Sequence, residues 1–141
     1  MIEEWLQQRQ HLIVLYCSIC GVHQQINDSP TKIQRLKSFC QTLVDYASAG
    51  HFEVYKRLLH EAEQVNDATL EIAEKTLPKI QETTEVLLDF NDRYETEELT
   101  EEMQVTLAKH LSKLGEAMVA RFDLEDELVG LAQSPRTAER A

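Results

Sequence analysis

Apolar residues recur every three or four positions over almost the whole of this chain. The clearest run lies toward the C-terminus, where Met103, Leu107, Leu111, Leu114 and Met118 share one face of a helix. Glycine and proline, which interrupt helices and form the turns of sheet proteins, number only 4 and 3 among 141 residues. So few helix breakers exclude a turn-rich sandwich or barrel. The spacing therefore predicts an all-α fold.

The N-terminal third contains two of these patterns, separated by a polar stretch. Helical spacing covers residues 2–20, and Gly21 fits the left-handed position that closes a helix. Residues 27–30, Asn-Asp-Ser-Pro, supply capping side chains and a proline suited to a first helical turn. A second helix is expected to follow, with its inner apolar stripe over residues 33–47.

Residues 48–50, Ser-Ala-Gly, interrupt that second helix. The helical spacing resumes over residues 52–62, so we expect two consecutive helices with a sharp bend between them. Asn66 and Asp67 offer the next helix cap. The pattern then runs to Pro78, where the chain must kink or restart, because proline lacks the N–H that an inner helical turn needs.

The C-terminal half predicts two more helical segments. Residues 80–94 continue the helical pattern, and an acidic loop over residues 95–102 leads to a helix start at Thr96 or Thr100. If the last helix is continuous as far as Ala132, it extends roughly 50 Å at 1.5 Å per residue. A helix of that length spans the whole of a small domain.

Together these patterns predict a single all-α domain over residues 1–133. We expect a helical bundle with a four-helix core, extra flanking helices and a long C-terminal helix. The shorter helices must either flank the core or continue one another. There is no internal repeat at solenoid period and no domain linker. Residues 134–141 are polar and are expected to form a flexible C-terminal tail.

The charge balance narrows the class of partner. The chain carries 14 Lys and Arg against 25 Asp and Glu, a net charge of −11 with a pI near 4.8. This sign disfavours direct binding to nucleic acid or to an anionic membrane, because both need cations that displace counterions. An acidic surface instead attracts basic partners, such as the DNA-binding face of a transcription protein. Solubility alone is the alternative explanation.

The cellular location is expected to be cytoplasmic. The N-terminus is acidic and amphipathic, without the basic and apolar regions of a signal peptide. The longest uninterrupted apolar stretch covers residues 12–16, far short of the ~20 residues that span a bilayer. Three cysteines, an odd number, do not indicate a disulfide framework.

A metal or redox site at Cys17, Cys20 and His23 is one hypothesis for chemistry in this chain. The spacing supplies only half of a zinc site, and Cys40 and His11 would have to arrive from other faces. The alternative is that the cysteines are small buried residues on the inner face of a helix. No catalytic or nucleotide-binding motif appears, so we expect a protein that is not an enzyme and needs no cofactor.

Charged residues interrupt the apolar run near the C-terminus. Arg121 and Glu125 are four residues apart and so lie on one helix face, with Asp126 beside them. The plain interpretation is a surface ion pair worth a few tenths of a kcal/mol. The sharper hypothesis is a partly buried network that fixes how the last helix packs.

Residues 39–61 are the richest part of the chain in aromatic rings. The segment holds Phe39 and Tyr46, seven residues apart and placed on a flanking helix face, together with Phe52 and Tyr55. Rings beside the carboxylate of Asp45 around an exposed helical elbow are typical of a protein-binding hot spot. The alternative is that the rings belong to the core and that Asp45 is simply solvated.

Three stretches of the chain carry a resemblance to a known family. They are EWLQQRQHLIVLY at residues 4–16, FCQTLVDYASAGHFEVYKRLLHE at residues 39–61 and LGEAMVARFDLEDELVGLA at residues 114–132. In this order they resemble the Rsd/AlgQ family, the bacterial regulators of sigma D, which are anti-sigma factors. The resemblance implies an all-helical bundle that binds the C-terminal, −35-reading domain of the primary sigma factor and withholds it from core RNA polymerase.

The resemblance also implies a set of contact residues. Asp45, Ser48 and Phe52 match the family's partner-contacting elbow. We expect Asp45 to accept hydrogen bonds from a sigma arginine, Phe52 to act as the apolar anchor and Ser48 to permit close approach. His51 and Tyr55 are neighbours that we include in the same site.

Other partners follow from the family with less support from these residues. Family members also bind the histidine phosphocarrier protein of the sugar phosphotransferase system and stimulate a guanosine tetraphosphate hydrolase, and either could be the main partner instead. The chain begins almost at Trp5 and lacks the N-terminal lead that family members often carry, so we expect any contact of that lead to be missing. Cys17 and Cys20 stand where the family has other residues.

Overall fold

The computed structural model describes the backbone of residues 2–25, 29–95 and 98–133, and the side chains of these residues outside 21–31. Within these ranges every regular element is helical. The elements are α1 (Ile2–Gln25), α2 (Ser29–Ala49), the π-helical segment η1 (Gly50–Val54), α3 (Tyr55–Val65), α4 (Asp67–Tyr94) and α5 (Glu101–Ala132). The all-α prediction is confirmed, whereas the predicted tail at residues 134–141 lies outside the described residues.

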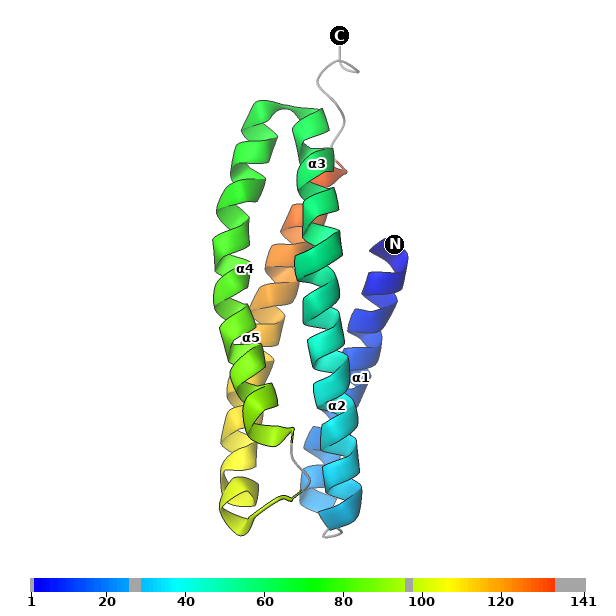
Figure 1. Cartoon of the computed structure of the whole chain (residues 1–141), viewed down its shortest axis with the longest axis vertical. Coiled ribbons are helices and arrows are strands. Elements are labelled where there is room, and N and C mark those ends of the chain that lie inside the picture. Colours follow the sequence, from blue (N-terminus) through cyan, green and yellow to red (C-terminus); the bar gives the residue numbers. More distant parts are fainter. Residues whose placement is uncertain (1, 26–28, 96–97, 134–141) are drawn as a thin grey trace.

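The helices form an elongated bundle. α2, η1 and α3 follow one another in a single line, and α4 and α5 run beside that line (Figure 1). α1 packs against α2, α2 against α4, and α4 against α5, while α1 also touches α5. Beyond the reach of α1, α3 packs directly on both α4 and α5. Of the two predicted arrangements for the shorter helices, flanking the bundle or continuing one another, α3 adopts the second, because it extends the line of α2 (Figure 1).

Two predicted breaks in the chain are absent. α1 does not end at Gly21 but continues to Gln25, and no glycine in the described ranges has a positive φ. Glycine permits the left-handed conformation without imposing it, and the glutamines that follow are good helix formers. α4 likewise runs through Pro78 without a restart. Pro78 is exposed, so water can reach the carbonyl group that lacks its helical partner.

The interruption at residues 48–50 is a change of helix type rather than a sharp bend. Ala49 and Tyr55, on either side of η1, both have right-handed helical backbone angles, with φ of −59° and −65°. α2 and α3 continue in one direction across η1 (Figure 1). The predicted bend is therefore wrong, since the chain stays helical and only the hydrogen-bonding pattern changes from i−4 to i−5.

Both predicted caps that fall within the described residues are confirmed. The side chain of Asn66 accepts a hydrogen bond from the backbone N–H of Thr69 at 2.7 Å. The hydroxyl of Thr100 accepts one from the N–H of Met103 at 3.2 Å, which places the start of α5. With 32 residues, α5 extends about 48 Å. The long C-terminal helix is thus confirmed.

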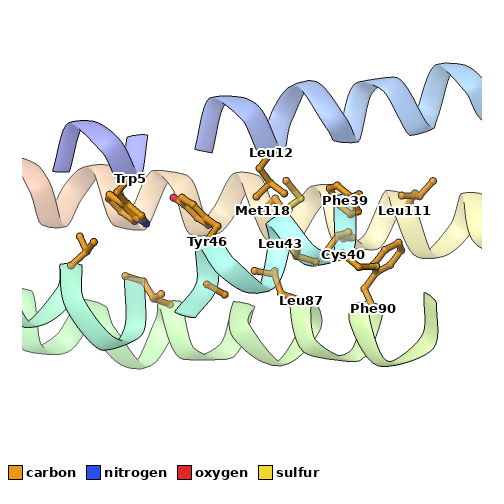
Figure 2. Close-up of a cluster of buried hydrophobic side chains, with 14 of the residues drawn as sticks. Trp5, Leu12, Phe39, Cys40, Leu43, Tyr46, Leu87, Phe90, Leu111 and Met118 are labelled. Atoms are coloured by element: carbon orange, nitrogen blue, oxygen red, sulfur yellow. The ribbon is translucent and has the colours of Figure 1, made fainter. Parts of the chain in front are cut away.

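The core lies between the helices along the length of the bundle. Figure 2 shows side chains from α1, α2, α4 and α5 pointing into one shared space, among them Leu12, Phe39, Leu87 and Met118. Phe39 and Tyr46, predicted to share a flanking face, are both fully buried, so that face also belongs to the core. Because α2 packs against α1 on one side and α4 on another, its buried face is wider than a single stripe.

Candidate protein-binding site

The aromatic segment around η1 has an outer and an inner face. On the outer face, Asp45, His51 and Phe52 are exposed and Ser48 is half-buried; we call these four residues the elbow face. Phe52 is the most prominent member, with 66% of its surface exposed. The other three Phe and Tyr rings of the segment are buried, as the core alternative expects, so the candidate hot spot contains one exposed phenyl ring together with polar groups.

The elbow face leaves one carboxylate without a cation. Asp45 accepts a hydrogen bond from the side-chain amide of Gln41 at 3.0 Å, one helical turn before it. No Lys or Arg within the described residues forms an ion pair with Asp45. His51 lies edge-on to Phe52, with the ring centroids 4.7 Å apart. The face therefore presents an anion and an apolar ring without a cationic partner of its own.

The inner face of the same segment converges on Glu125 of α5, which is fully buried. The hydroxyl of Tyr46 donates a hydrogen bond to one carboxylate oxygen, and the hydroxyl of Tyr55 donates to the other. Both donors are themselves buried. A buried carboxylate is stable only when its oxygens are paired in this way.

The π-helical segment explains how both tyrosines reach one carboxylate. Tyr46 and Tyr55 are nine residues apart, and at 100° per residue an uninterrupted α-helix would place them about 180° apart. A π turn carries one extra residue, which reduces that angle to about 80°. Gly50 makes room for this turn, because a Cβ at that position would lie 2.9 Å from the ring and hydroxyl of Tyr55.

Two arginines complete the inner face. Arg9 of α1 donates to Tyr46 at 3.0 Å, to Glu125 at 3.2 Å and to Asp126 at 2.6 Å. Its guanidinium also lies over the ring of Phe122, 4.9 Å from the centroid. Arg9 therefore ties α1 to both α2 and α5.

Arg121 of α5 is fully buried and reaches in the other direction. It donates to the hydroxyls of Thr84 at 2.7 Å and Thr83 at 3.2 Å on α4, and to Tyr55 at 2.9 Å. Its Nε lies 3.3 Å from a carboxylate oxygen of Glu125, which is a charge contact without hydrogen-bond geometry. We call the set Arg9, Tyr46, Tyr55, Arg121 and Glu125 the buried network.

The charges of the buried network fix its hydrogen bonds. Burial raises the pKa of the Tyr46 phenol, and the negative charge of Glu125 raises it further. The same two causes raise the pKa of Tyr55. Burial lowers the pKa of Arg9, but its hydrogen bonds to Tyr46 and Asp126 outweigh that effect, so the pKa is raised overall. Both tyrosines therefore remain protonated donors and Arg9 remains a cation at neutral pH.

Aromatic packing surrounds the network on the α1 side. The ring of Trp5 stacks on Tyr46, with centroids 5.3 Å apart, and meets the edge of Tyr55 at 6.2 Å. Figure 2 shows Trp5 and Tyr46 side by side in the core. The EWLQQRQ stretch at the N-terminus thus contributes Trp5 and Arg9, one helical turn apart, to the same inner site.

The structure separates the two hypotheses that the sequence left open for Arg121 and Glu125. Both side chains are fully buried, which confirms the network and excludes a surface ion pair. Sequence reasoning missed the link from Glu125 to Tyr46 and Arg9, because these residues lie 79 and 116 positions away in the chain. The spacing of nine between the tyrosines gave no signal either, because an uninterrupted α-helix would place them on opposite faces.

The cysteines do not form a site within the described residues. Cys17 is exposed and Cys20 half-buried, so the expectation of buried cysteines holds only for Cys40. Burial raises the pKa of the Cys40 thiol to about 12, which keeps it protonated. The side chain of His23 lies outside the described residues. Among the side chains that are described, no group of three His, Cys, Asp or Glu residues could hold a metal ion.

The length and apolar character of the helices decide whether any of them could cross a membrane. Within the described residues, none of them combines the length and the apolar character needed to cross a bilayer.

Comparison with known proteins identifies the family. Residues 1–133 match the family described as "Regulator of RNA polymerase sigma(70) subunit, Rsd/AlgQ". A Regulator of sigma D from Yersinia pseudotuberculosis is 35% identical over 130 residues, which cover 92% of this chain and 77% of that protein. A Regulator of sigma D from Shigella boydii is 35% identical over 135 residues, covering 92% and 81%. No solved structure gives a significant match. The chain therefore belongs to the Rsd/AlgQ family of regulators of the RNA polymerase sigma-70 subunit.

Proposed function

We propose that this protein is an anti-sigma factor that binds the C-terminal, −35-reading domain of the primary sigma factor through the elbow face. The observation that carries the proposal is the exposure of Phe52, at 66%, on the same segment as Asp45, an exposed carboxylate that lacks a cationic partner within the described residues. An exposed aromatic ring next to an unpaired charge is typical of an interface centre. The other rings of this segment are buried and cannot serve as anchors without unfolding.

Charge complementarity favours this partner. A domain that reads promoter DNA presents Lys and Arg to the phosphate backbone. A protein with a net charge of −11 is attracted to such a surface over long range. Once docked, Asp45 would accept a charge-assisted hydrogen bond from an arginine of the sigma domain, and Phe52 would enter an apolar pocket.

The elbow residues take different roles in this proposal. Asp45 and Phe52 make the main contacts, and half-buried Ser48 between them permits close approach. His51 supports the Phe52 ring from the side, at 4.7 Å between centroids. Tyr55 is only 6% exposed, so we assign it to holding the turn from inside rather than to touching the partner.

The mechanism is occlusion rather than catalysis. A sigma domain covered on the surface that meets the promoter and the polymerase is withheld from both, so no chemical step is needed. The histidine phosphocarrier protein and the guanosine tetraphosphate hydrolase remain alternative main partners, because an exposed ring and a carboxylate could also serve a different basic surface.

Calorimetric titration against the isolated C-terminal domain of the cognate primary sigma factor tests the proposal. We expect Asp45→Ala and Phe52→Ala each to weaken binding by more than about 1 kcal/mol, with helicity unchanged. Asp92→Ala and Val119→Ala are matched controls, because both residues are exposed and lie outside the elbow face. The controls should bind as the unaltered protein does.

Three outcomes distinguish the alternatives. Strong binding that ignores both elbow substitutions would keep the anti-sigma role but remove the elbow face from it. An absence of sigma binding, with binding of the phosphocarrier protein or the hydrolase in the same assay, would make that protein the main partner. Failure of the bound complex to compete with core polymerase for full-length sigma factor would contradict withholding.

A further inference from the structure

A second polar site lies on α4 and α5, neither of which contributes to the elbow face. A hollow of about 100 Å³ opens between these helices. Its lining residues belong to the parts of α4 and α5 toward the end of the bundle where α4 ends and α5 begins, and Figure 1 shows that end of the two helices. The side chains that matter for its chemistry are Asp89, Phe90, Arg93, His110, Lys113 and Leu114. Phe90 and Leu114 are core residues and form an apolar floor.

Cations gather at this hollow without acidic partners. Arg93 and Lys113 line it, and Lys109 lies one turn before Lys113 on α5. Within the described part of the chain, none of the three forms a hydrogen bond or an ion pair with an acidic side chain. By contrast, Arg57 and Lys75 each lie within 3.5 Å of a glutamate one turn away. Unpaired clustered cations are unexpected where acidic residues outnumber basic ones by 25 to 14.

His110 lines the hollow and is close to its charged side chains. Its Nδ1 lies 2.5 Å from the hydroxyl of Tyr94, which holds the ring in place. Burial lowers the pKa of the His110 imidazole, and the charges of Arg93, Lys109 and Lys113 lower it further. Arg93, Lys109 and Lys113 outnumber the one carboxylate in the lining, so the charge at the hollow is positive, although the protein as a whole is strongly negative. Asp89 is the acidic residue that lines the hollow and opposes this potential.

We propose that this hollow binds a phosphate group, either as inorganic phosphate or as the phosphoryl group of a small phosphomonoester, held by Arg93, Lys113 and His110. Arginine and lysine are the side chains that bind phosphate oxygens most strongly. The imidazole becomes a third cation once a bound phosphate favours its protonated form. Pockets for drug-sized ligands measure about 300–1,000 Å³, so a hollow of about 100 Å³ matches a small group better than a whole nucleotide.

The site is independent of the proposed sigma interface. It shares no residue with the elbow face, so both could be occupied at once. Phosphate binding would neutralise the unpaired cations and favour the charged form of His110. Occupancy therefore has a readout within the protein itself, and failure of sigma binding would leave the test intact.

Proton NMR of the His110 imidazole provides the test. The signal is assigned with His110→Gln and followed against pH in the full chain, first in sodium chloride and then in sodium phosphate of equal ionic strength. We expect phosphate to raise the titration midpoint of His110 by about one pH unit. The same titration with glycerol 3-phosphate tells the two sources of the group apart, since a response to only one of them identifies the ligand class.

Substitutions then assign the binding to the named residues. Arg93→Gln and Lys113→Gln should each raise the phosphate concentration at half-effect about tenfold. Asp89→Asn removes the opposing charge and should lower that concentration. Lys79→Gln, an exposed lysine more than three turns from Arg93 on the same helix, removes one positive charge elsewhere and should leave it unchanged.

Two results would overturn the proposal. Equal His110 midpoints in chloride and phosphate would show that only ionic strength acts on the imidazole. A phosphate response that Lys79→Gln diminishes as much as Arg93→Gln would show attraction to overall charge without a defined site.

Discussion

Asp45 and Glu125 are two carboxylates on opposite sides of the same aromatic segment, and they differ in burial and in hydrogen bonding. Glu125 is fully buried and accepts hydrogen bonds from two tyrosines and Arg9. Asp45 is exposed, with a side-chain amide as its neighbour. The difference shows that one segment has two roles. Its inner face binds Glu125 and holds the bundle together, whereas its outer face carries a carboxylate that has no cationic partner within the described residues.

The comparison is tested most severely by removing the buried carboxylate. Glu125→Ala would leave Arg9 and Arg121 facing two tyrosine hydroxyls without an anion between them. Breaking a buried ion pair on one side typically costs about 3–5 kcal/mol, and we expect a loss of that size in the free energy of unfolding. Urea denaturation followed by circular dichroism measures it.

Glu127→Ala is the matched control for that substitution. Glu127 is exposed and lies two residues further along α5. Its removal should change the free energy of unfolding by less than about 0.5 kcal/mol. A loss below about 1 kcal/mol for Glu125→Ala would mean that the buried network does not stabilise the bundle.

Alkaline pH should destabilise the same buried network without any mutation. The pKa of Tyr46 and Tyr55 is raised in the folded protein, first by burial and then by Glu125, from an ordinary value of 10.0. A raised pKa means that the folded state holds its protons more tightly than the unfolded state. The stabilisation is therefore complete below about pH 10 and is lost as pH rises above it.

We expect the free energy of unfolding to fall steeply above pH 10, with tyrosinate absorbance appearing together with unfolding. Tyr16, which burial and neighbouring Cys20 raise to a pKa of about 12, contributes in the same direction. Tyr46→Phe combined with Tyr55→Phe should flatten the decline, because the two buried donors no longer titrate. A decline that is equally steep in this double variant would assign the pH dependence to other groups.

Two glycine substitutions test how closely the backbone of η1 packs against the buried network. Gly50→Ala places a methyl group 2.9 Å from the ring of Tyr55, so the ring or the π turn must shift. Overpacking of this kind costs about 1–3 kcal/mol. Gly130→Ala is the matched control, since a Cβ at that position meets no atom within 4 Å. It should stabilise α5 by up to about 1 kcal/mol, because alanine is the better helix former.

Thermal denaturation of both glycine variants gives the contrast directly. Hydrogen exchange at residues 50–54 adds a local readout, which should rise in Gly50→Ala alone if Tyr55 holds the turn. Equal stability in the two variants would show that the close approach of Tyr55 to Gly50 does not matter.

The sequence could predict what depends on neighbours in the chain. The stripe from Met103 to Met118 and the caps at Asn66 and Thr100 are set by near neighbours in the chain. All of them are confirmed, with Met103 half-buried against the core and the rest of the stripe buried. The breaks predicted at Gly21 and Pro78 are absent. Glycine permits a non-helical conformation and proline disfavours a helical one, but neither decides the structure, and the surrounding helices continue through both.

The candidate site was predictable only on its outer face. The family resemblance singled out Asp45 and Phe52, which are exposed, whereas the inner face depends on Arg9 and Glu125, which are 116 residues apart. No periodicity reveals such a contact. The π turn also escapes pattern analysis, because one extra residue per turn changes the phase of the helix without changing its composition.

The smallest effect on stability is expected at the carboxylate with which the comparison began. Asp45→Ala removes an exposed hydrogen bond from Gln41, which lies one helical turn before it. Contacts of this kind contribute a few tenths of a kcal/mol. It also changes the net charge from −11 to −10, which slightly relieves repulsion. We therefore expect urea denaturation to place its free energy of unfolding within about 0.5 kcal/mol of the unaltered protein. A larger loss would mean that Asp45, like Glu125, supports the fold, and its effect on partner binding could then no longer be attributed to a direct contact.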